Sequence, residues 1–400
     1  MSLALLLPGR LASRFLPFNC SNAAWTLGCR AVIQASTSPF SNHPQSTHYV
    51  APITMSGRRQ SSTASPKPIS HPRPSSSVVL LSPSNQVLLL HRVQTSTSFA
   101  SAHVFPGGNL DPYHDGAVPD VDSPGRHEDG EAYRLGAIRE CFEETGILLA
   151  KAKNGGDDLI ALPSEEIQAA RKKIHSNQIK FGDWLESINA VPDTSNLRPF
   201  TRWITPTNVP KRFTTQMYLY MLPLASNLPS EMLVPTPDGG VEHTAAVFAP
   251  AQHFLSLAAS KDIILFPPQA FLLVLLTRFI AAASEASLEE YTSQRERLLS
   301  FLQQVPTAET AKGREHPTSR ISWADKVMSP HNLFIRASDG RIVLGIDKPG
   351  PELKGTTRGG DWERVVLVRF TKAGPTEVEI RLRQDVLEEE RQAKGGGNKL

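Results

Sequence analysis

Short apolar runs separated by turn residues mark the part of the chain that we expect to fold, which begins near Ser77. The runs 78–81 and 87–90 are joined by Ser-Pro-Ser-Asn-Gln, and a third run at 103–105 leads into Pro-Gly-Gly. Apolar runs of this length between turn residues are typical of strands joined by tight turns. Further strands are predicted at 216–222, 332–336, 341–346, 364–371 and 377–382.

A longer apolar repeat distinguishes the helical segments. From Glu131 the chain reads EAYRLGAIRECFEETGILLA, and at about 100° per residue its apolar side chains fall on one helix face. Gly146 stands where this helix should end, because glycine readily adopts the left-handed conformation that closes a helix. The predicted apolar face comprises Leu135, Ile138, Cys141, Phe142 and Thr145. Other helices are predicted at 163–175, 180–188, 263–276 and 287–304.

Segments without periodicity divide the chain into regions. Residues 1–76 are expected to form a disordered targeting region. Residues 109–130 are rich in Asp, Gly and Pro and are interpreted as an exposed insertion, whereas the helices within 151–200 are interpreted as an inserted cap. The remaining regions are a helix at 286–311, a β-rich extension at 312–383 that opens with a polar linker at 312–320, and a polar, mobile tail at 384–400.

Charge is unevenly distributed. The formal net charge is +3, yet the first acidic residue is Asp111 and residues 1–110 carry eight Lys and Arg, so the rest of the chain sums to −5. A slightly acidic folded part excludes a protein that coats nucleic acid. No apolar run reaches the roughly 18 to 20 residues that a membrane span needs. Three cysteines do not make a disulfide framework. We expect neither nucleic acid nor a membrane as a partner.

The N-terminus has the composition of a mitochondrial presequence. MSLALLLPGRLASRFLPF combines apolar residues with Arg10 and Arg14, and no acid follows for some 90 residues. The last three residues, Asn-Lys-Leu, resemble the peroxisomal signal Ser-Lys-Leu. A product that starts at Met55 would lack the presequence. We expect a mitochondrial protein, with the peroxisome as the alternative location; a disordered basic tail and a chance tripeptide are the plainer interpretations.

Three carboxylates fall within a 100° arc of the predicted helix, those of Glu140, Glu143 and Glu144. Like charges one turn apart destabilise a helix by about 0.2–0.5 kcal/mol per pair, and a divalent cation would relieve that repulsion. Mg²⁺ and Mn²⁺ take oxygen ligands and readily share them with phosphate oxygens. Taken by itself, a cluster of three glutamates is better explained as a solvated acidic helix face.

The sequence around these glutamates resembles the Nudix box, whose pattern is G-x5-E-x7-R-E-U-x-E-E-x-G-U, where U is a bulky aliphatic residue. Two glycines are candidates for the first position. Gly125 has the literal spacing, whereas Gly108 has the Phe-Pro-Gly-Gly context of the family, and we favour Gly108, with 109–129 enlarged by insertion. The later positions are taken by Glu131, Arg139, Glu140, Cys141, Glu143, Glu144, Gly146 and Ile147.

The resemblance implies an α+β fold, an α/β/α sandwich in which the box helix packs on a mixed β-sheet. Here the Nudix domain would span 77–285, with an inserted helical cap and a small β-rich C-terminal appendage. The implied cofactor is Mg²⁺ or Mn²⁺. The implied metal ligands are Glu140, Glu143, Glu144 and the carbonyl of Gly108, with Arg139, Glu140 and Glu143 in the catalytic set and Glu131 in the outer shell.

Flanking residues are similar to the acyl-coenzyme A diphosphatase branch of the family, which is found in mitochondria and peroxisomes and carries an insertion in its box. The segment 88–108 matches the coenzyme A signature in spacing, with Thr97 in place of an Arg and Ser101 in place of a Gly. Segments 202–206, 210–215 and 267–269 resemble that branch as well.

Several residues near these motifs are candidates for substrate binding. Arg92, Lys211 and Arg212 suit the anionic parts of a nucleotide, because guanidinium and ammonium groups both bind phosphate. Aromatic side chains can stack on a base, and Glu242 is a candidate general base from outside the box. The aromatic candidates are Phe213 and Trp203. Surface charge and core packing are the plainer interpretations of these residues.

Three functions remain open on sequence grounds, all with a small nucleotide as partner. The first is metal-dependent hydrolysis of the diphosphate of coenzyme A or acyl-coenzyme A. The second is the same reaction on dinucleotides or nucleotide sugars, which Thr97 and Ser101 keep open. The third is a nucleotide-binding regulatory module without turnover, against which the intact box glutamates argue. The sequence does not predict an oligomeric state.

Overall fold

The computed structural model describes residues 69–94, 101–224, 235–236, 243–280 and 286–395. Contacts group residues 66–400 into one compact unit. The predicted presequence and C-terminal tripeptide, together with Thr97 and Glu242, lie outside the described residues. None of the described helices is long and apolar enough to cross a membrane.

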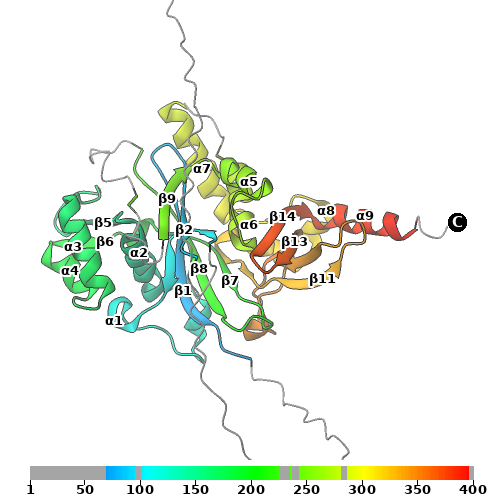
Figure 1. Cartoon of the computed structure of the whole chain (residues 1–400), viewed down its shortest axis with the longest axis horizontal. Coiled ribbons are helices and arrows are strands. Elements are labelled where there is room, and N and C mark those ends of the chain that lie inside the picture. Colours follow the sequence, from blue (N-terminus) through cyan, green and yellow to red (C-terminus); the bar gives the residue numbers. More distant parts are fainter. Residues whose placement is uncertain (1–68, 95–100, 225–234, 237–242, 281–285, 396–400) are drawn as a thin grey trace, which may run out of the picture. The chain divides into compact units, whose positions relative to one another are not determined.

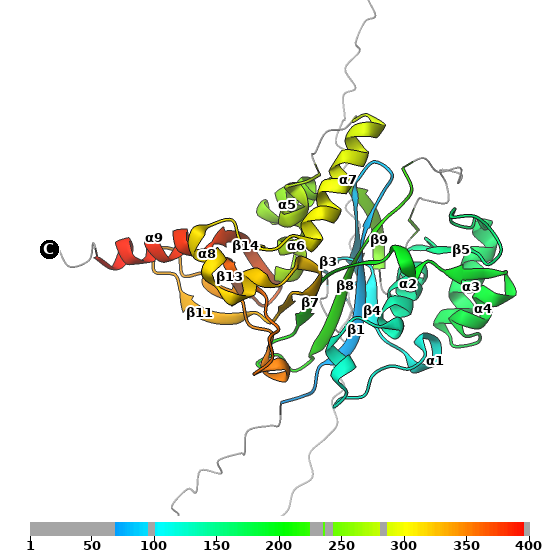
Figure 2. The same cartoon turned by 180° about the vertical axis from the view of Figure 1, so that it is seen from behind.

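A mixed eight-stranded sheet forms the centre of this unit (Figures 1 and 2). Its strands are β1 (Arg73–Leu81), β2 (Val87–Arg92), β3 (His103–Val104), β4 (Gly107–Asn109), β7 (Arg198–Ile204), β8 (Phe213–Met221), β9 (His243–Ala249) and β10 (Val327–Met328). They hydrogen-bond in the order β10-β7-β8-β1-β2-β3, with β4 paired to β1 and β9 paired to β2. The β1·β8 and β10·β7 pairs are parallel and the others antiparallel, which confirms the predicted mixed sheet.

Strand β1 begins at Arg73, earlier than the apolar run at 78–81 indicated. Its first half is serine-rich, yet Ser75, Ser76 and Ser77 are buried. The backbone pairs with β8 along its whole length, and the hydroxyls find partners as well, since Ser75 Oγ lies 2.6 Å from Thr215 Oγ1 and Ser77 Oγ donates to the carbonyl of Pro106 at 2.7 Å. Strand pairing therefore extends the element beyond its apolar residues.

The sheet is covered on both faces. Successive residues of a strand point to opposite sides, and accordingly Val78 and Leu80 belong to one core cluster while Val79 and Leu81 belong to another. The first cluster includes α2 (Glu131–Thr145). The second includes α5 (Ala251–Ala259), α6 (Pro267–Thr277) and α7 (Leu288–Gln303). The result is the predicted sandwich, with α2 and α6 on opposite sides of the sheet (Figure 1).

Helix α2 has the predicted bounds and termination. Gly146 adopts a left-handed conformation with φ of 77°, and its N–H donates to the carbonyl of Phe142 at 2.8 Å. Ile138, Cys141 and Phe142 of its apolar face are fully buried. Burial also raises the pKa of the Cys141 thiol to about 12, so this cysteine is an apolar packing residue at neutral pH.

A helical insertion packs beside α2. It consists of β5 (Ala150–Ala152), α3 (Ser164–His175), α4 (Phe181–Ser187) and β6 (Ala190–Pro192), and the two strands pair with each other. Phe142 of α2 stacks on Trp184 with ring centroids 4.8 Å apart. The two predicted helices of the insertion are therefore confirmed, and aromatic contacts fix them to α2.

The interpretation of 109–130 as an exposed insertion is wrong in part. The segment contains α1 (Pro112–Asp115) and a 3₁₀ turn η1 (Pro124–His127), and it buries His114, Asp115 and His127. His114 Nδ1 accepts the N–H of Phe181 at 3.1 Å. Polar residues were taken as a sign of exposure, but here they are buried because each has partners in other elements.

The C-terminal extension forms a second sheet of four antiparallel strands, β11 (His331–Ile335), β12 (Ile342–Ile346), β13 (Asp361–Thr371) and β14 (Gly374–Leu382). Leu344, Ile346 and Val366 share a core cluster with Phe271 of α6. The short strand β10 just before it pairs with β7 of the central sheet. The extension is therefore integrated into the main body rather than appended to it. The segment expected to be a polar linker folds as α8 (Ala311–Glu315) and η4 (Pro317–Arg320).

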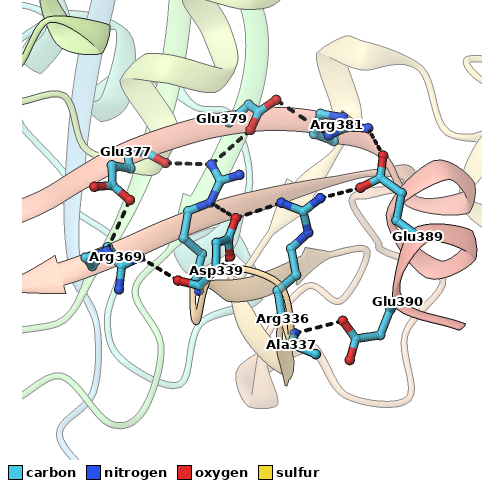
Figure 3. Close-up of polar contacts among 10 residues, drawn as sticks. Arg336, Ala337, Asp339, Arg369, Glu377, Glu379, Arg381, Glu389 and Glu390 are labelled. Carbon is cyan, nitrogen blue, oxygen red and sulfur yellow. Dashed lines mark hydrogen bonds and ion pairs between the residues drawn. The ribbon is translucent and has the colours of Figure 1, made fainter. Parts of the chain in front are cut away.

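The tail expected to be mobile from 384 onward instead contains α9 (Arg383–Gly395). A network of charged side chains joins this helix to the second sheet (Figure 3). Arg336 pairs with Asp339 at 2.7 Å and also with Glu389 of α9, and Arg381 of β14 pairs with Glu389 at 2.7 Å. Glu389 thus connects arginines of the second sheet to α9, and Val386 of the same helix is buried.

Candidate active site

Two carboxylates of α2, those of Glu140 and Glu144, approach the turn into β4 at Gly107 and Gly108. The N–H of Gly107 donates to Glu144 Oε2 at 2.7 Å. The Glu140 carboxyl lies so close to Gly108 that a Cβ there would be 2.5 Å from it, and a Cβ on Gly107 would be 2.3 Å from the carbonyl oxygen of Ser76. Only glycine fits at Gly107, where the clash would be with backbone, whereas a side chain at Gly108 would displace the Glu140 carboxyl.

The space around each glycine distinguishes the two candidates for the first position of the box. Gly125 lies in η1, and the nearest atom to a Cβ built there would be Ser123 Oγ at 3.6 Å. A side chain would fit there without displacing anything. Gly108, in contrast, lies directly against Glu140, which is the placement that the preferred interpretation expects.

Arg139 is the centre of the cluster. Its Nη1 donates to Glu140 Oε1 and to Glu143 Oε1, both at 2.9 Å. Its other two nitrogens, Nε and Nη2, each donate to Asp115 at 2.8 Å, and Nη2 also donates to the carbonyl of Asn109 at 3.0 Å. Burial alone would lower the pKa of Arg139, but Glu140, Asp115 and Glu143 hold it well above its usual value. The guanidinium is a permanent cation that fixes the orientation of two carboxylates.

The carboxyl of Glu140 is perturbed by its surroundings. Burial raises its pKa to about 7, opposed by the cation of Arg139 and reinforced by the neighbouring Glu143 and Asp115. Burial is the main cause of this rise in pKa, because it disfavours the charged form, and the two neighbouring carboxyls add to it. Added positive charge at this point would stabilise the ionised form.

Asp115 holds the position that sequence analysis gave to Glu131. The Asp115 carboxylate is fully buried and makes a bidentate pair with Arg139, whereas Glu131 is exposed at the first residue of α2. A buried bidentate pair with a guanidinium is the strong form of such a contact. The spacing pattern could not find Asp115, because the residue lies before the helix in a segment without periodicity.

Two further elements reach the carboxylates. From the cap, Arg171 Nε donates to the backbone carbonyl of Glu143 at 2.8 Å, and His175 Nδ1 lies 3.4 Å from Glu143 Oε2. From β9, the fully buried His243 places Nε2 at 3.6 Å from Glu144 Oε1. These contacts were not predicted, because they join segments far apart in the sequence.

The donor set of this cluster fits a hard divalent cation. The carboxylates offer oxygen donors, the guanidinium of Arg139 already bridges two of them, and the backbone of Gly108 lies close to Glu140. Within the described part of the chain, no three His, Cys, Asp or Glu side chains form a ready-made metal cage. The residues therefore suit a divalent cation by the chemistry of their donor atoms, and they do not form a closed coordination shell.

The cluster opens into a large cavity of about 1850 Å³. Gly108, Arg139 and Glu140 contribute to its wall, and so do residues from β1, β7, β8 and the C-terminal extension. Several predicted substrate-binding residues also line it, namely Arg92, Lys211, Phe213 and Trp203. The structure thus brings most of the predicted site residues together in one cavity.

Arg212 does not line this cavity, contrary to the predicted phosphate contact. Its side chain is 1% exposed, and its Nη1 lies 2.5 Å from Glu352 Oε1 of the C-terminal extension. Nε donates to the carbonyl of Thr205 at 2.9 Å and Nη1 to that of Ser70 at 2.9 Å. Arg212 therefore links the β7–β8 loop to the segment around Glu352.

Replacing Arg212 with methionine should destabilise the protein by about 1–3 kcal/mol, because Glu352 would lose its partner while remaining largely shielded. The variant Glu352→Gln should cost less, since a neutral amide can still accept from Arg212. Urea unfolding of both single variants and the double variant measures the coupling free energy. Additive effects, with a coupling free energy near zero, would contradict this role.

Comparisons with known proteins agree with the site. A sequence profile described as the NUDT19 Nudix domain matches residues 122–276, which include the whole stretch from Glu131 to Ile147. Residues 122–276 therefore match a Nudix domain, and the profile that they match is that of the NUDT19 branch.

Individual relatives are distant. "Acyl-coenzyme A diphosphatase NUDT19" of Gallus gallus is 26% identical over 52% of this chain and 65% of its own length, and its Homo sapiens counterpart is 25% identical over 34% and 48%. "Putative nudix hydrolase 7" of Caenorhabditis elegans is 31% identical over 34% of this chain and 40% of its own length. The chain thus spans less than two thirds of the length of these relatives. A NUDIX hydrolase structure from Alicyclobacillus acidocaldarius gives a TM-score of 0.41 at 22% identity, covering 55% of this chain and 96% of that one.

Proposed function

We propose that the protein is a metal-dependent hydrolase that cuts the diphosphate of coenzyme A or acyl-coenzyme A. The observation that carries the proposal is the approach of Glu140 and Glu144 to Gly107 and Gly108, with Glu143 joined to Glu140 through Arg139, at the wall of a cavity lined by Arg92 and Lys211. Carboxylates that can hold a cation beside cationic side chains that can bind phosphate are what diphosphate hydrolysis requires.

The chain's own residues would act mainly by holding and orienting. Glu140, Glu143, Glu144 and the carbonyl of Gly108 would hold Mg²⁺ or Mn²⁺. The bound cation supplies charge neutralisation of the diphosphate and lowers the pKa of a water molecule. Arg139 keeps the carboxylates in place through the 2.9 Å contacts of Nη1, and Asp115 in turn fixes Arg139. Arg92 and Lys211 would bind the phosphate oxygens. Whether Glu242 acts as the general base remains a prediction from the sequence.

The backbone at Ser101 supports the coenzyme A assignment. The coenzyme A signature has a glycine at this position, and Ser101 adopts φ of 57°, the left-handed region that favours glycine. The chain thus keeps the conformation that the signature implies even though the residue differs. The names of the vertebrate relatives and a cavity larger than the roughly 300–1,000 Å³ of ordinary ligand pockets point the same way.

A substrate panel tests the proposal. The full chain is incubated with coenzyme A, acetyl-coenzyme A, a diadenosine polyphosphate, ADP-ribose or a nucleotide sugar, with Mg²⁺, with Mn²⁺ or with EDTA, and products are identified by mass. We expect adenosine 3′,5′-bisphosphate and a phosphopantetheine product, formed only with metal. Turnover confined to dinucleotides or nucleotide sugars would replace the substrate assignment, and binding without any turnover would favour the regulatory module.

Arg92→Ala should raise KM more than it lowers kcat, because a phosphate contact is felt in the ground state as well as in the transition state. A charge-assisted hydrogen bond is worth about 1.5–3 kcal/mol, so KM should rise by roughly 10- to 150-fold. Arg297→Ala, which removes an exposed guanidinium of α7 away from the cavity, is the matched control. An unchanged KM on every accepted substrate would show that Arg92 is surface charge only.

A further inference from the structure

The C-terminal extension builds part of the wall of the active-site cavity. The segment 348–358 contributes Lys348, Lys354 and Arg358 to the lining, next to residues of the Nudix domain. Sequence analysis assigned no chemistry to this region. Its position in the same cavity as Glu140 gives it a part in binding whatever the carboxylate cluster acts on.

This segment is built to keep its position. It bends at Gly350 and Gly355, whose φ angles of 98° and 86° are in the left-handed region that favours glycine. Between them, Glu352 is anchored by Arg212, which is buried in the main body. Near its end, Arg358 Nη2 donates to the carbonyl of His127 at 3.4 Å. Its cations are therefore presented to the cavity by a fixed loop.

Charge in the cavity is strongly positive. The described lining contains six side chains of Lys or Arg and only two carboxylates, Asp111 and Glu140. Arg139 pairs with carboxylates of its own cluster, whereas Lys348, Lys354 and Arg358 come from the segment 348–358. These three cations are additional to the Nudix-domain residues that we propose to bind the diphosphate.

A further buried cation, Arg202, lies near the contact between Arg358 and His127, since Arg202 and His127 both contact Thr214. Arg202 is 2% exposed, with its guanidinium 4.4 Å from the centre of the Tyr133 ring, and its Nε and Nη2 have no hydrogen-bond partner among the described residues. Burial, reinforced by Arg202, lowers the pKa of nearby His127 to about 4. Buried guanidinium groups with unused donors raise the potential of the adjacent surface, because the low dielectric screens them little.

We infer that the segment 348–358 binds a second anionic group of the substrate, a phosphomonoester separate from the diphosphate that is cut. Lys348 and Lys354 are exposed, with the flexible ammonium groups that bind a phosphate as point charges. In a substrate of the coenzyme A class this group is the 3′-phosphate of the ribose. The inference rests on the proposed function for the identity of the substrate, but not for the existence of the anion site.

The test compares ligands that differ only in this phosphate. Kinetics of the full chain are measured with coenzyme A and with dephospho-coenzyme A, for the parent and for the double variant Lys348→Ala/Lys354→Ala. We expect KM for coenzyme A to rise at least tenfold in the variant, while KM for dephospho-coenzyme A changes less than twofold. A variant that affects both substrates equally, or neither, overturns the inference.

Lys312→Ala/Lys372→Ala is the matched control. It removes the same charge from exposed positions of the same extension that do not line the cavity. Any effect that the two double variants share is then a long-range effect of net charge, which also weakens at high salt. Only the difference between them counts for a local anion site.

A binding measurement tests the anion site independently of the proposed reaction. Titration calorimetry compares adenosine 3′,5′-bisphosphate with adenosine 5′-monophosphate, without any turnover. We expect the bisphosphate to bind the parent at least tenfold more tightly, and this preference to vanish in Lys348→Ala/Lys354→Ala. If neither coenzyme is hydrolysed but this preference is seen, the proposed reaction fails and the anion site stands. Equal affinities in the parent overturn the anion site even if coenzyme A is hydrolysed.

Discussion

The variant Glu144→Gln should fold normally and lose activity by about 10²-fold or more, the scale of removing an electrostatic group from a transition state. An amide oxygen can still accept the N–H of Gly107, now 2.7 Å from Glu144 Oε2, so the turn is kept. The substitution removes the negative charge of Glu144, which is one of the ligands proposed for the cation. The measurement is kcat/KM at saturating Mg²⁺.

Glu131→Gln is the matched control for this variant. It removes the same charge from the same helix, but from an exposed position two turns before the cluster. Its activity should stay near that of the parent. Circular dichroism and thermal unfolding of both variants establish that any loss is not one of folding. Activity of Glu144→Gln within about threefold of the parent, against the 10²-fold scale for a catalytic electrostatic group, would remove Glu144 from the proposed metal site.

Asp115→Ala should be the most destabilising single change in the site. Breaking a buried ion pair by removing one partner costs about 3–5 kcal/mol, and Asp115 is fully buried against Arg139. The value should fall at the lower end, since Glu140 and Glu143 remain to compensate the guanidinium. Without Asp115, Arg139 is also free to turn, so activity should fall in the fraction that stays folded.

Urea unfolding of Asp115→Ala and of Glu131→Ala makes the comparison direct. Exposed substitutions away from special features usually change stability by less than about 0.5 kcal/mol, which is the expectation for Glu131→Ala. Equal stabilities of the two variants would show that the Asp115–Arg139 pair contributes nothing net. A larger loss for Glu131→Ala would restore the assignment that the spacing of the box suggested.

The parts of the site that local sequence determines were predictable. Helix α2, its end at Gly146 and its buried face follow from a repeat of apolar residues within fifteen positions. The convergence of Glu140 on Gly108 was expected from the family resemblance, and geometry supports it. Contacts between distant segments were not predictable, since no local pattern records that Asp115 meets Arg139 or that Glu352 meets Arg212.

Some helices and strands were predicted incorrectly because many of their residues are polar. Strand β1 was predicted too short because its serines look like loop residues. Helix α9 was taken for a tail because most of its residues are charged. In each case tertiary partners supply what the local sequence lacks: a parallel neighbour for β1, and arginine partners for Glu389 of α9. Propensity is a weak guide where such partners exist.

Because β10 pairs with β7, the central sheet cannot be completed during synthesis until β10 has left the ribosome. Strand β7 emerges long before β10, and at roughly 5–20 residues per second the stretch between them takes on the order of ten seconds to synthesise. During that interval the edge of β7 has not yet paired with Met328, and the apolar side of α6 has not yet packed against Leu344. A nascent chain at this stage presents an open strand edge beside uncovered apolar side chains, the combination that chaperones recognise and that aggregates when left unprotected.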